Sequence, residues 1–326
     1  MRRIIPETAN AQRVCSQIML ATITEEGQRP PLPLEMLSVQ AIAEQIFDYE
    51  FLANSADPVL PDTLEVLAAS PGQRELLVGL LMCLALVSGE ARTEVVTVID
   101  RVAAQLQVSL PQRDLLRFAL RRQPRRFLWR ITCNAAIDYW AKGGHPSLRD
   151  WAQIARQAFI PQLLTSRQIA KRYQDLERFP RESLGRAVYD FYRSHEWALP
   201  GEPKGMPEQF IVHECTHVLT GYGTDPHSEM LTAVFTAGAK RRNAIDWFLL
   251  PLMQWHLKEP VASLSRRDAY RGLLQPQKYF HAMRRGMDSR ISLMDDHWSF
   301  WENAHHSVAA LCERYNIRPA DPALVS

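Results

Sequence analysis

The chain has 326 residues, of which 46% are hydrophobic, and a formal net charge of +2 at pH 7. This composition suffices for a packed core, and the near-neutral charge argues against nucleic acid as a partner. The five cysteines are scattered without a CxxC pair, which argues against a disulfide framework and fits a reducing cytoplasm. The longest apolar run, residues 76–87, is too short to span a bilayer, and no apolar stretch follows the basic N-terminus. We therefore expect a cytoplasmic protein, attached at most to the inner face of the membrane.

Helical spacing of apolar residues dominates the chain from end to end, and no segment alternates convincingly like a β-strand. In chain order, the segments that the spacing and the flanking Gly or Pro residues predict to be helical are 36–53, 73–87, 92–107, 111–122, 125–141, 147–159, 183–197, 207–220, 226–239, 243–257, 266–283 and 297–315. The sequence therefore predicts an all-α protein.

The loop of residues 142–146, Lys-Gly-Gly-His-Pro, is the best candidate for a domain boundary. It divides the chain into a helical N-terminal module, residues 1–145, and a second helical domain, residues 146–326. Residues 70–120 weakly resemble the tellurite-resistance TerB-like helical domains, which have an apolar helix, an acidic turn with glycine and an amphipathic helix. Ser88 stands where that turn usually has aspartate, so we expect packing or partner binding here, not metal binding.

Residues 117–130 carry six arginines interleaved with Phe118, Phe127 and Trp129. Three interpretations are open for this stretch. The stretch could be a solvated helix face whose arginine stems cover apolar surface, a segment that contacts an anionic membrane surface, or a nucleic-acid-binding segment. Salt-dependent flotation with anionic liposomes would test the membrane interpretation.

The motif with the most chemical content is His213-Glu214-Cys215-Thr216-His217. Residues four apart lie on one face of a helix, so the two histidines can offer their imidazoles to one metal ion. Cys215 lies about 200° round the helix from His213, at the roughly 100° per residue of an α-helix, and is expected to be a small buried residue. Chance spacing on a surface helix is the alternative.

A third candidate ligand, Glu229, follows His217 after an intervening stretch of eleven residues. Gly221 is expected to end the first helix, and Asp225 and Pro226 to cap and begin the next one. A tight helical hairpin would then bring Glu229 close to both histidines. The sequence predicts a divalent metal site, with zinc as the first choice and other divalent ions open.

One interpretation of this site is a zinc metallopeptidase, in which Glu214 of the HExxH motif is the general base. The metzincin pattern needs glycine at position 220 and histidine at position 223, where this chain has Thr220 and Gly223. The thermolysin type has a longer gap before its glutamate. The hydrolase remains an alternative.

The other interpretation is a resemblance. The run His213-Glu214-x-x-His217-x11-Glu229 resembles the H-D-x-x-H-x11-E signature of the coenzyme Q biosynthesis protein-four family. Outside the motif, the similarity to this family covers about residues 150–326 and includes Ser183-Leu184-Gly185-Arg186, Val218–Gly221, Trp301-Glu302, Leu311 and Asn316-Ile317. The departure is Glu214, where the family has aspartate.

The resemblance implies an all-helical protein of ubiquinone (isoprenoid quinone) biosynthesis. It implies His213, His217 and Glu229 as metal ligands, and Glu214 as a fourth ligand or as the catalytic acid/base group. The implied activity is metal-dependent oxidative removal of the ring C1 carboxyl group of a polyprenylated benzoate precursor and its replacement by hydroxyl. The implied partners are the isoprenoid precursor, other quinone-biosynthesis proteins and the membrane surface. A non-catalytic scaffold and a homodimer stay open.

Two further stretches have a functional and a packing interpretation. Residues 247–255, Trp-Phe-Leu-Leu-Pro-Leu-Met-Gln-Trp, would line a groove for the isoprenoid tail or form a buried core helix, and the core is favoured. His297, Trp301 and His305 are spaced one helical turn apart and are expected to serve packing and solvent contacts.

Overall fold

The structure is a computed structural model that describes residues 6–52, 56–67, 70–89, 92–109, 116–117, 126, 138–139, 147–148, 165–242, 244–257, 272–295 and 297–318. Every element of regular secondary structure in these ranges is a helix, and the only extended pairing among them is an isolated bridge between Ser183 and Ser307. The predicted all-α fold class is confirmed. The predicted helices 111–122, 125–141 and 147–159, the arginine-rich stretch and the loop at 142–146 lie almost entirely outside the described residues.

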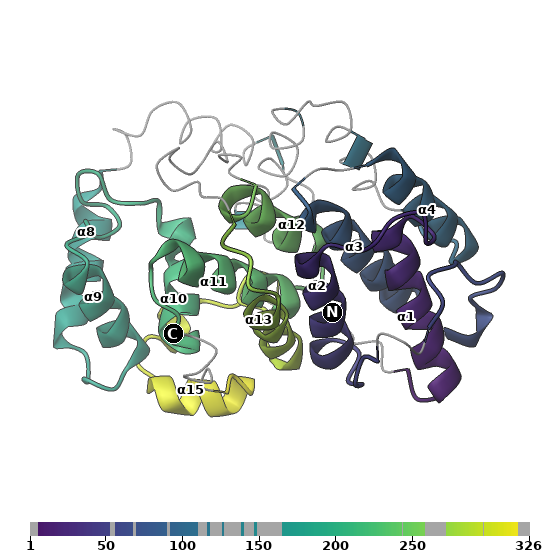
Figure 1. The fold of residues 1–326 in the computed structure, drawn as a ribbon. Coiled ribbons are helices and arrows are strands. Elements are labelled where there is room, and N and C mark those ends of the chain that lie inside the picture. Colours follow the sequence, from purple (N-terminus) through teal and green to yellow (C-terminus); the bar gives the residue numbers. More distant parts are fainter. Residues whose placement is uncertain are drawn as a thin grey trace.

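The N-terminal helices form one end of the molecule (Figure 1). They are α1 (Ala9–Thr24), α2 (Pro33–Gln45), the short 3₁₀ helix η2 (Glu65–Leu67), α3 (Pro71–Val87) and α4 (Thr93–Gln105). Helices α3 and α4 agree with the sequence prediction within two residues. They are joined by a turn in which Gly89 has a φ of +88°, a backbone conformation that favours glycine.

Helix α1 was not predicted, because its sequence lacks a polar face. Its residues from Val14 to Thr24 are all buried, including Ser16, Gln17 and Thr22. Two of these polar side chains bond inside the core: the Ser16 hydroxyl with that of Tyr49 at 2.9 Å, and the Thr22 hydroxyl with the Ile18 carbonyl at 2.8 Å. A helix that is buried all round has no amphipathic stripe for a sequence pattern to detect.

The C-terminal helices make up the rest of the described fold. They are α8 (Arg167–Gln174), η4 (Asp175–Arg178), α9 (Leu184–Ser194), η5 (Glu208–Phe210), α10 (Ile211–Thr220), α11 (Pro226–Ala239), α12 (Ala244–Trp255), α13 (Pro276–Asp288), α14 (Phe300–Asn303) and α15 (Val308–Tyr315). Helices α8 and α9 lie at the end opposite to α1 and α4, and α10 to α13 lie between them (Figure 1).

Helix α11 is the centre of this region and packs against α12 and α13. Two glycines let α11 and α13 approach closely. A Cβ atom on Gly238 would collide with the Met283 carbonyl oxygen, and one on Gly286 would collide with the Phe235 carbonyl oxygen. The backbones therefore touch at two points, which fixes the position of α11 along and around its axis relative to α13.

The N-terminal helices pack directly on this centre. Helix α2 lies against α13, where Arg284 donates to Asp48 at 2.8 Å. Helix α3 lies against α12, where a Cβ on Gly79 would come within 3.0 Å of the side chains of Phe248 and Ile245. The buried apolar residues of both regions form one continuous hydrophobic core.

Two predicted helix ranges were wrong in their bounds, and one short helix was missed. The segment 36–53 is α2, which ends at Gln45 before Asp48 takes a φ of +65°. The segment 266–283 corresponds to α13, which begins only at Pro276, a residue that suits the first turn of a helix. Helix α8 was missed, since it has only eight residues.

The predicted helix 297–315 is two helices, α14 and α15. The residues between them hydrogen-bond to the start of α9 instead of continuing the helix: the Leu184 and Gly185 amides donate to the carbonyls of His306 and Ala304, both at 2.8 Å. Ser307 then caps α15, its hydroxyl accepting from the Ala310 amide. His297, Trp301 and His305 therefore do not share one helix face.

A buried ionic cluster lies just beyond the C-terminal end of α11. Lys240 is 0% exposed, and its Nζ lies 3.1 Å from Asp138 Oδ2 and 2.9 Å from Asp295 Oδ1. The indole of Trp247 donates to Asp138 at 2.7 Å, and the Arg241 amide donates to Asp295 at 2.6 Å. Buried charges are tolerated when they are paired and hydrogen-bonded in this way.

Candidate metal site

The hairpin of α10 and α11 forms as the sequence predicts. Gly221 ends α10 with a φ of +78°, and its amide donates to the His217 carbonyl at 2.8 Å. The Asp225 carboxylate caps α11 by accepting from the His227 and Ser228 amides at 3.0 and 3.2 Å. Helix α10 itself begins at Ile211, after the short 3₁₀ helix η5, and not at Pro207.

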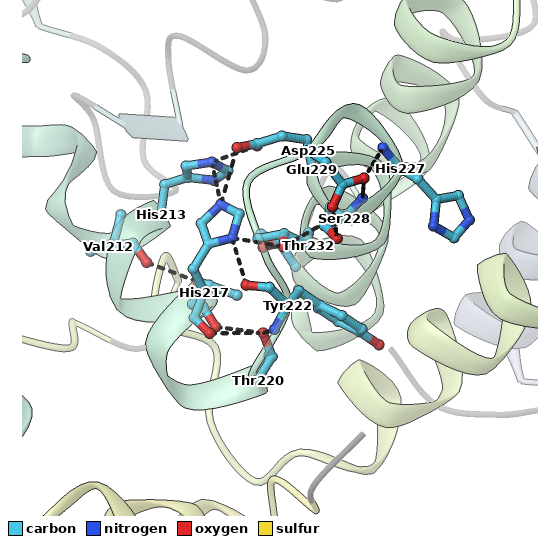
Figure 2. A network of polar contacts seen from close by, with 12 residues as sticks. Val212, His213, His217, Thr220, Tyr222, Asp225, His227, Ser228, Glu229 and Thr232 are labelled. Carbon is cyan, nitrogen blue, oxygen red and sulfur yellow. Dashed lines mark hydrogen bonds and ion pairs between the residues drawn. The ribbon is translucent and has the colours of Figure 1, made fainter. Parts of the chain in front are cut away.

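This hairpin brings three predicted ligands together (Figure 2). Oxygen Oε2 of Glu229 lies 3.1 Å from His213 Nε2, and its Oε1 lies 3.5 Å from His217 Nε2. The two histidine Nε2 atoms are 3.1 Å apart. Among the described residues, these three form the one group of His, Cys, Asp or Glu side chains whose ligand atoms all lie within 4.8 Å of one another.

These separations fit a metal ion. Ligand atoms about 2.0–2.1 Å from a tetrahedral zinc ion lie roughly 3.3–3.4 Å from one another. The observed separations of 3.1, 3.1 and 3.5 Å scatter around that value. Two imidazoles and one carboxylate are also a donor set that zinc accepts, with a further position left for a water or a substrate.

The pKa values of His213 and Glu229 are shifted in opposite directions. Burial lowers the pKa of His213, but the hydrogen bond and the negative charge of Glu229 raise it more, to about 9. Burial raises the pKa of Glu229, but its interactions with the imidazoles of His213 and His217 lower it more, to about 2. A proton on His213 thus balances the carboxylate in the metal-free cluster, and a divalent ion would replace that proton.

The other nitrogen of His217 is held by groups behind it. Its Nδ1–H donates to the Tyr222 carbonyl at 3.3 Å, and Thr232 Oγ1 lies at the same distance. The Thr232 hydroxyl donates to the Ser228 carbonyl at 3.0 Å, so its oxygen is free to accept from the imidazole. This arrangement favours the tautomer that leaves Nε2 unprotonated toward the cluster, as a metal ligand requires.

Glu214 does not belong to the group of three candidate ligands. Its side chain is only 7% exposed. Burial raises the pKa of its carboxyl, and the charges of His213 and His217 offset part of this effect. Cys215 is fully buried, as predicted, and burial raises the pKa of its thiol.

A cavity of about 290 Å³ shares the first turn of α10 with the cluster. Ile211 and Val212, which line it, directly precede His213. Its other walls combine the aromatic rings of Tyr139, Trp298, Phe300 and Trp301 with the aliphatic side chains of Leu293 and Met294 and the polar groups of Asp138, Arg172, Glu208, Gln209 and Ser299. Burial and the charges of Glu214 and Glu229 raise the pKa of Tyr139.

Two polar side chains that line this cavity are held in place by contacts with aromatic residues. The Arg172 guanidinium lies 3.6 Å from the centre of the Trp301 ring. Glu208 Oε1 accepts from the Trp301 indole at 3.0 Å and from the Tyr173 hydroxyl at 3.2 Å. Sequence reasoning missed Arg172, Glu208 and Tyr139 because they come from three segments far apart in the chain and have no motif of their own.

The other predicted stretches have structural roles. Residues 247–255 are buried throughout α12, which agrees with the core interpretation. Ser183 caps α9, and a Cβ atom on Gly185 would crowd the Phe179 ring and the Ala304 carbonyl oxygen, so this part of the Ser-Leu-Gly-Arg segment packs α9 against the end of α14. His305 stacks on Phe179 at a ring separation of 4.1 Å.

No family model matches the chain, and neither the curated proteins nor the solved structures gave a match. Within the ranges that the structure describes, none of the helices combines the length and the hydrophobicity needed to cross a membrane. The fold and the cluster together thus describe an all-helical protein with a converging His-His-Glu group beside an aromatic cavity.

Proposed function

We propose that this protein binds a divalent metal ion, zinc first, at His213, His217 and Glu229, and acts in isoprenoid-quinone biosynthesis. The proposed reaction replaces the ring carboxyl group of a polyprenylated benzoate precursor by hydroxyl. That replacement is an oxidation, so an external oxidant is a co-substrate. The observation that carries the proposal is the spacing of the three ligand atoms, 3.1 to 3.5 Å, on a hairpin whose sequence resembles the coenzyme Q biosynthesis signature.

A bound metal would polarise the carboxylate and phenolic oxygens of such a substrate. The residues around the cavity would supply space for the ring of the substrate and hydrogen bonds to its substituents. The aromatic cavity beside α10 has the size for one substituted ring, since ligand pockets begin at about 300 Å³. Arg172, placed against Trp301, offers hydrogen-bond donors to a ring substituent, and Glu208 offers an acceptor held in place by two donors.

Glu214 is the proposed acid/base group. Its raised pKa keeps the carboxyl protonated to higher pH than that of a free glutamate, so it can give a proton to a developing charge near the ligands. It lies next to His213 in α10 and outside the converging group, which supports a role in proton transfer more than a role as a fourth ligand.

The experiment is metal analysis and mass spectrometry of bound lipid on the purified protein, with quinone profiling of a deletion strain. Wild type should carry close to one divalent ion per chain and an isoprenoid lipid, and the strain should accumulate a carboxylated polyprenyl precursor. His217→Ala should lose the metal. His227→Ala is the matched control, because His227 points away from the cluster (Figure 2). A folded wild type that takes up neither metal nor lipid contradicts the proposal.

Two alternatives are separated by Glu214→Gln. A zinc hydrolase would cleave casein or a peptide library and lose that activity in the variant. The structure gives this alternative little support, because the described residues contain no strand edge for an extended peptide. A non-catalytic scaffold for other quinone-biosynthesis proteins, as a homodimer or on the membrane surface, would keep quinone production in the variant.

A further inference from the structure

Arg285, on α13, is a buried cation that no carboxylate pairs with among the described residues. Its side chain is 7% exposed, and within the part of the chain that the structure describes its Nε and Nη1 atoms have no hydrogen-bond partner. Only Nη2 is bonded, to the carbonyls of Thr220 at 3.0 Å and Arg318 at 2.6 Å. Burying a guanidinium without a carboxylate partner costs free energy. The groups that Arg285 contacts therefore indicate which part of the fold it stabilises.

Those contacts converge on the turn between α10 and α11. Thr220 is the last residue of α10, and a cation at a helix C-terminus interacts favourably with the exposed carbonyls there. The guanidinium carbon also lies 4.8 Å from the centre of the Tyr222 ring, within the range of a cation–π interaction. Arg285 therefore restrains the turn on both sides of Gly221.

This turn holds the imidazole of a proposed metal ligand. The Tyr222 carbonyl accepts the hydrogen bond from His217 Nδ1. The Tyr222 amide in turn lies 3.5 Å from the Thr220 hydroxyl, so the two residues that Arg285 contacts are also linked to each other. A shift of the turn would move this carbonyl away from Nδ1 and release both the ring orientation and the tautomer of His217.

We propose that Arg285 is a positioning residue for the metal site: by clamping Thr220 and Tyr222 it keeps the Tyr222 carbonyl on His217 Nδ1, so that His217 Nε2 faces the ion. This inference rests on the proposed metal binding. Groups behind a histidine ligand typically contribute about 10- to 100-fold to metal affinity. Arg285 acts through the turn and not on the imidazole itself, so we expect the lower end of that range.

The test compares Arg285→Met with Arg284→Met. Arg284 is the preceding residue of α13 and has its own partners, Asp48 and the Gln45 carbonyl, far from the turn. Zinc affinity is measured by competition with a chromophoric chelator, the Co²⁺ absorption spectrum reports ligand geometry, and ¹⁵N NMR of labelled histidine reports the His217 tautomer. We expect about 10-fold weaker zinc binding, a changed Co²⁺ spectrum and mixed tautomers for Arg285→Met only.

The outcomes separate the two proposals. If wild type binds no metal, the proposed function fails and this inference fails with it. If wild type binds zinc and a folded Arg285→Met binds it equally well with an unchanged spectrum, only the positioning role is overturned. Tighter binding in Arg285→Met also overturns it, since the effect would then be charge repulsion. Should Arg285→Met not fold, Tyr222→Leu removes the ring contact but keeps the carbonyl, and it must weaken zinc binding for the proposal to stand.

Discussion

Helix α11 has a polar cluster near each end, and the two clusters differ in how their charges are balanced. At the N-terminal end, Glu229 faces two imidazoles and is about a quarter exposed. Beyond the C-terminal end, Lys240 lies between Asp138 and Asp295 and is completely buried. The first cluster holds its positive charge as an exchangeable proton, whereas the second holds it as a side chain.

The difference supports the histidine cluster, and not the lysine cluster, as the proposed binding site. In the lysine cluster the cation is covalently part of the chain. Trp247 donates to the same Asp138 oxygen as Lys240, and the backbone amides of Arg241 and Arg242 donate to the second oxygen of Asp295. Such a site has no place for a ligand and serves the fold. In the histidine cluster two imidazoles and one carboxylate converge, and this is the group that we propose binds a metal ion. The predictions below test this contrast, from the largest expected effect to the smallest.

Removing the internal cation should be the most damaging change. Lys240→Met leaves the carboxylates of Asp138 and Asp295 buried without a partner, and we expect it to lower the free energy of unfolding by about 3–5 kcal/mol. Urea denaturation followed by circular dichroism measures this. Lys171→Met, on the exposed side of α8, is the control and should change stability by less than about 0.5 kcal/mol. A loss of stability no larger than that of the control would show that the cluster is not structural.

Zinc binding at the proposed site should stabilise the protein. At a zinc concentration one hundred times the Kd, binding to the folded state contributes about 2.7 kcal/mol, which raises the Tm of a chain of this size by roughly 5 °C. Glu229→Gln should abolish the shift in a thermal denaturation series. An equal shift in Glu229→Gln would place the bound zinc elsewhere.

The lysine cluster should also give the protein a characteristic response to acid. Burial raises the pKa of Asp295, but the charge and hydrogen bond of Lys240 lower it more, so the folded pKa lies below the ordinary value. Asp295 therefore contributes stability above pH 4, and this contribution is lost as the pH falls through the folded pKa. Asp295→Asn should cost about 2 kcal/mol at pH 7, since Asp138 still pairs with Lys240. The difference from wild type should shrink in denaturation curves measured from pH 5 toward pH 2, and a difference that is constant with pH would contradict this account.

The smallest effect is expected at the support of His217. Thr232→Val removes one of two acceptors near Nδ1, and because the Tyr222 carbonyl remains, zinc affinity should fall by less than about 10-fold. Thr236→Val, one turn further along α11, also loses a hydroxyl that bonds to the backbone and should leave the affinity unchanged. Equal affinities for all three proteins would mean that Thr232 does not support the imidazole.

The histidine hairpin could be predicted from sequence because its determinants are local. His213 and His217 are one turn apart, and Gly221, Asp225 and Pro226 each act on the backbone next to them. The lysine cluster could not be predicted, since Lys240 meets Asp138 and Asp295 only through tertiary packing. Helix α1 was not predicted because it is buried on all sides and has no apolar periodicity. The segment 297–315 was predicted as one helix because the turn that divides it is held by hydrogen bonds to Leu184 and Gly185, which are far away in the sequence. The predicted role of Glu214 and the resemblance to a quinone-biosynthesis family stay predictions.

The packing of α2 on α13 has a consequence for how the chain is made. Gln45 and Gln277, which meet across this contact, are 232 positions apart. At a synthesis rate of roughly 5–20 residues per second, α2 leaves the ribosome on the order of tens of seconds before α13 exists. During that time α2 can pack on α1 and α3, but its face toward α13 has no native cover. Truncation after α12 would leave this face exposed and should yield an aggregating product.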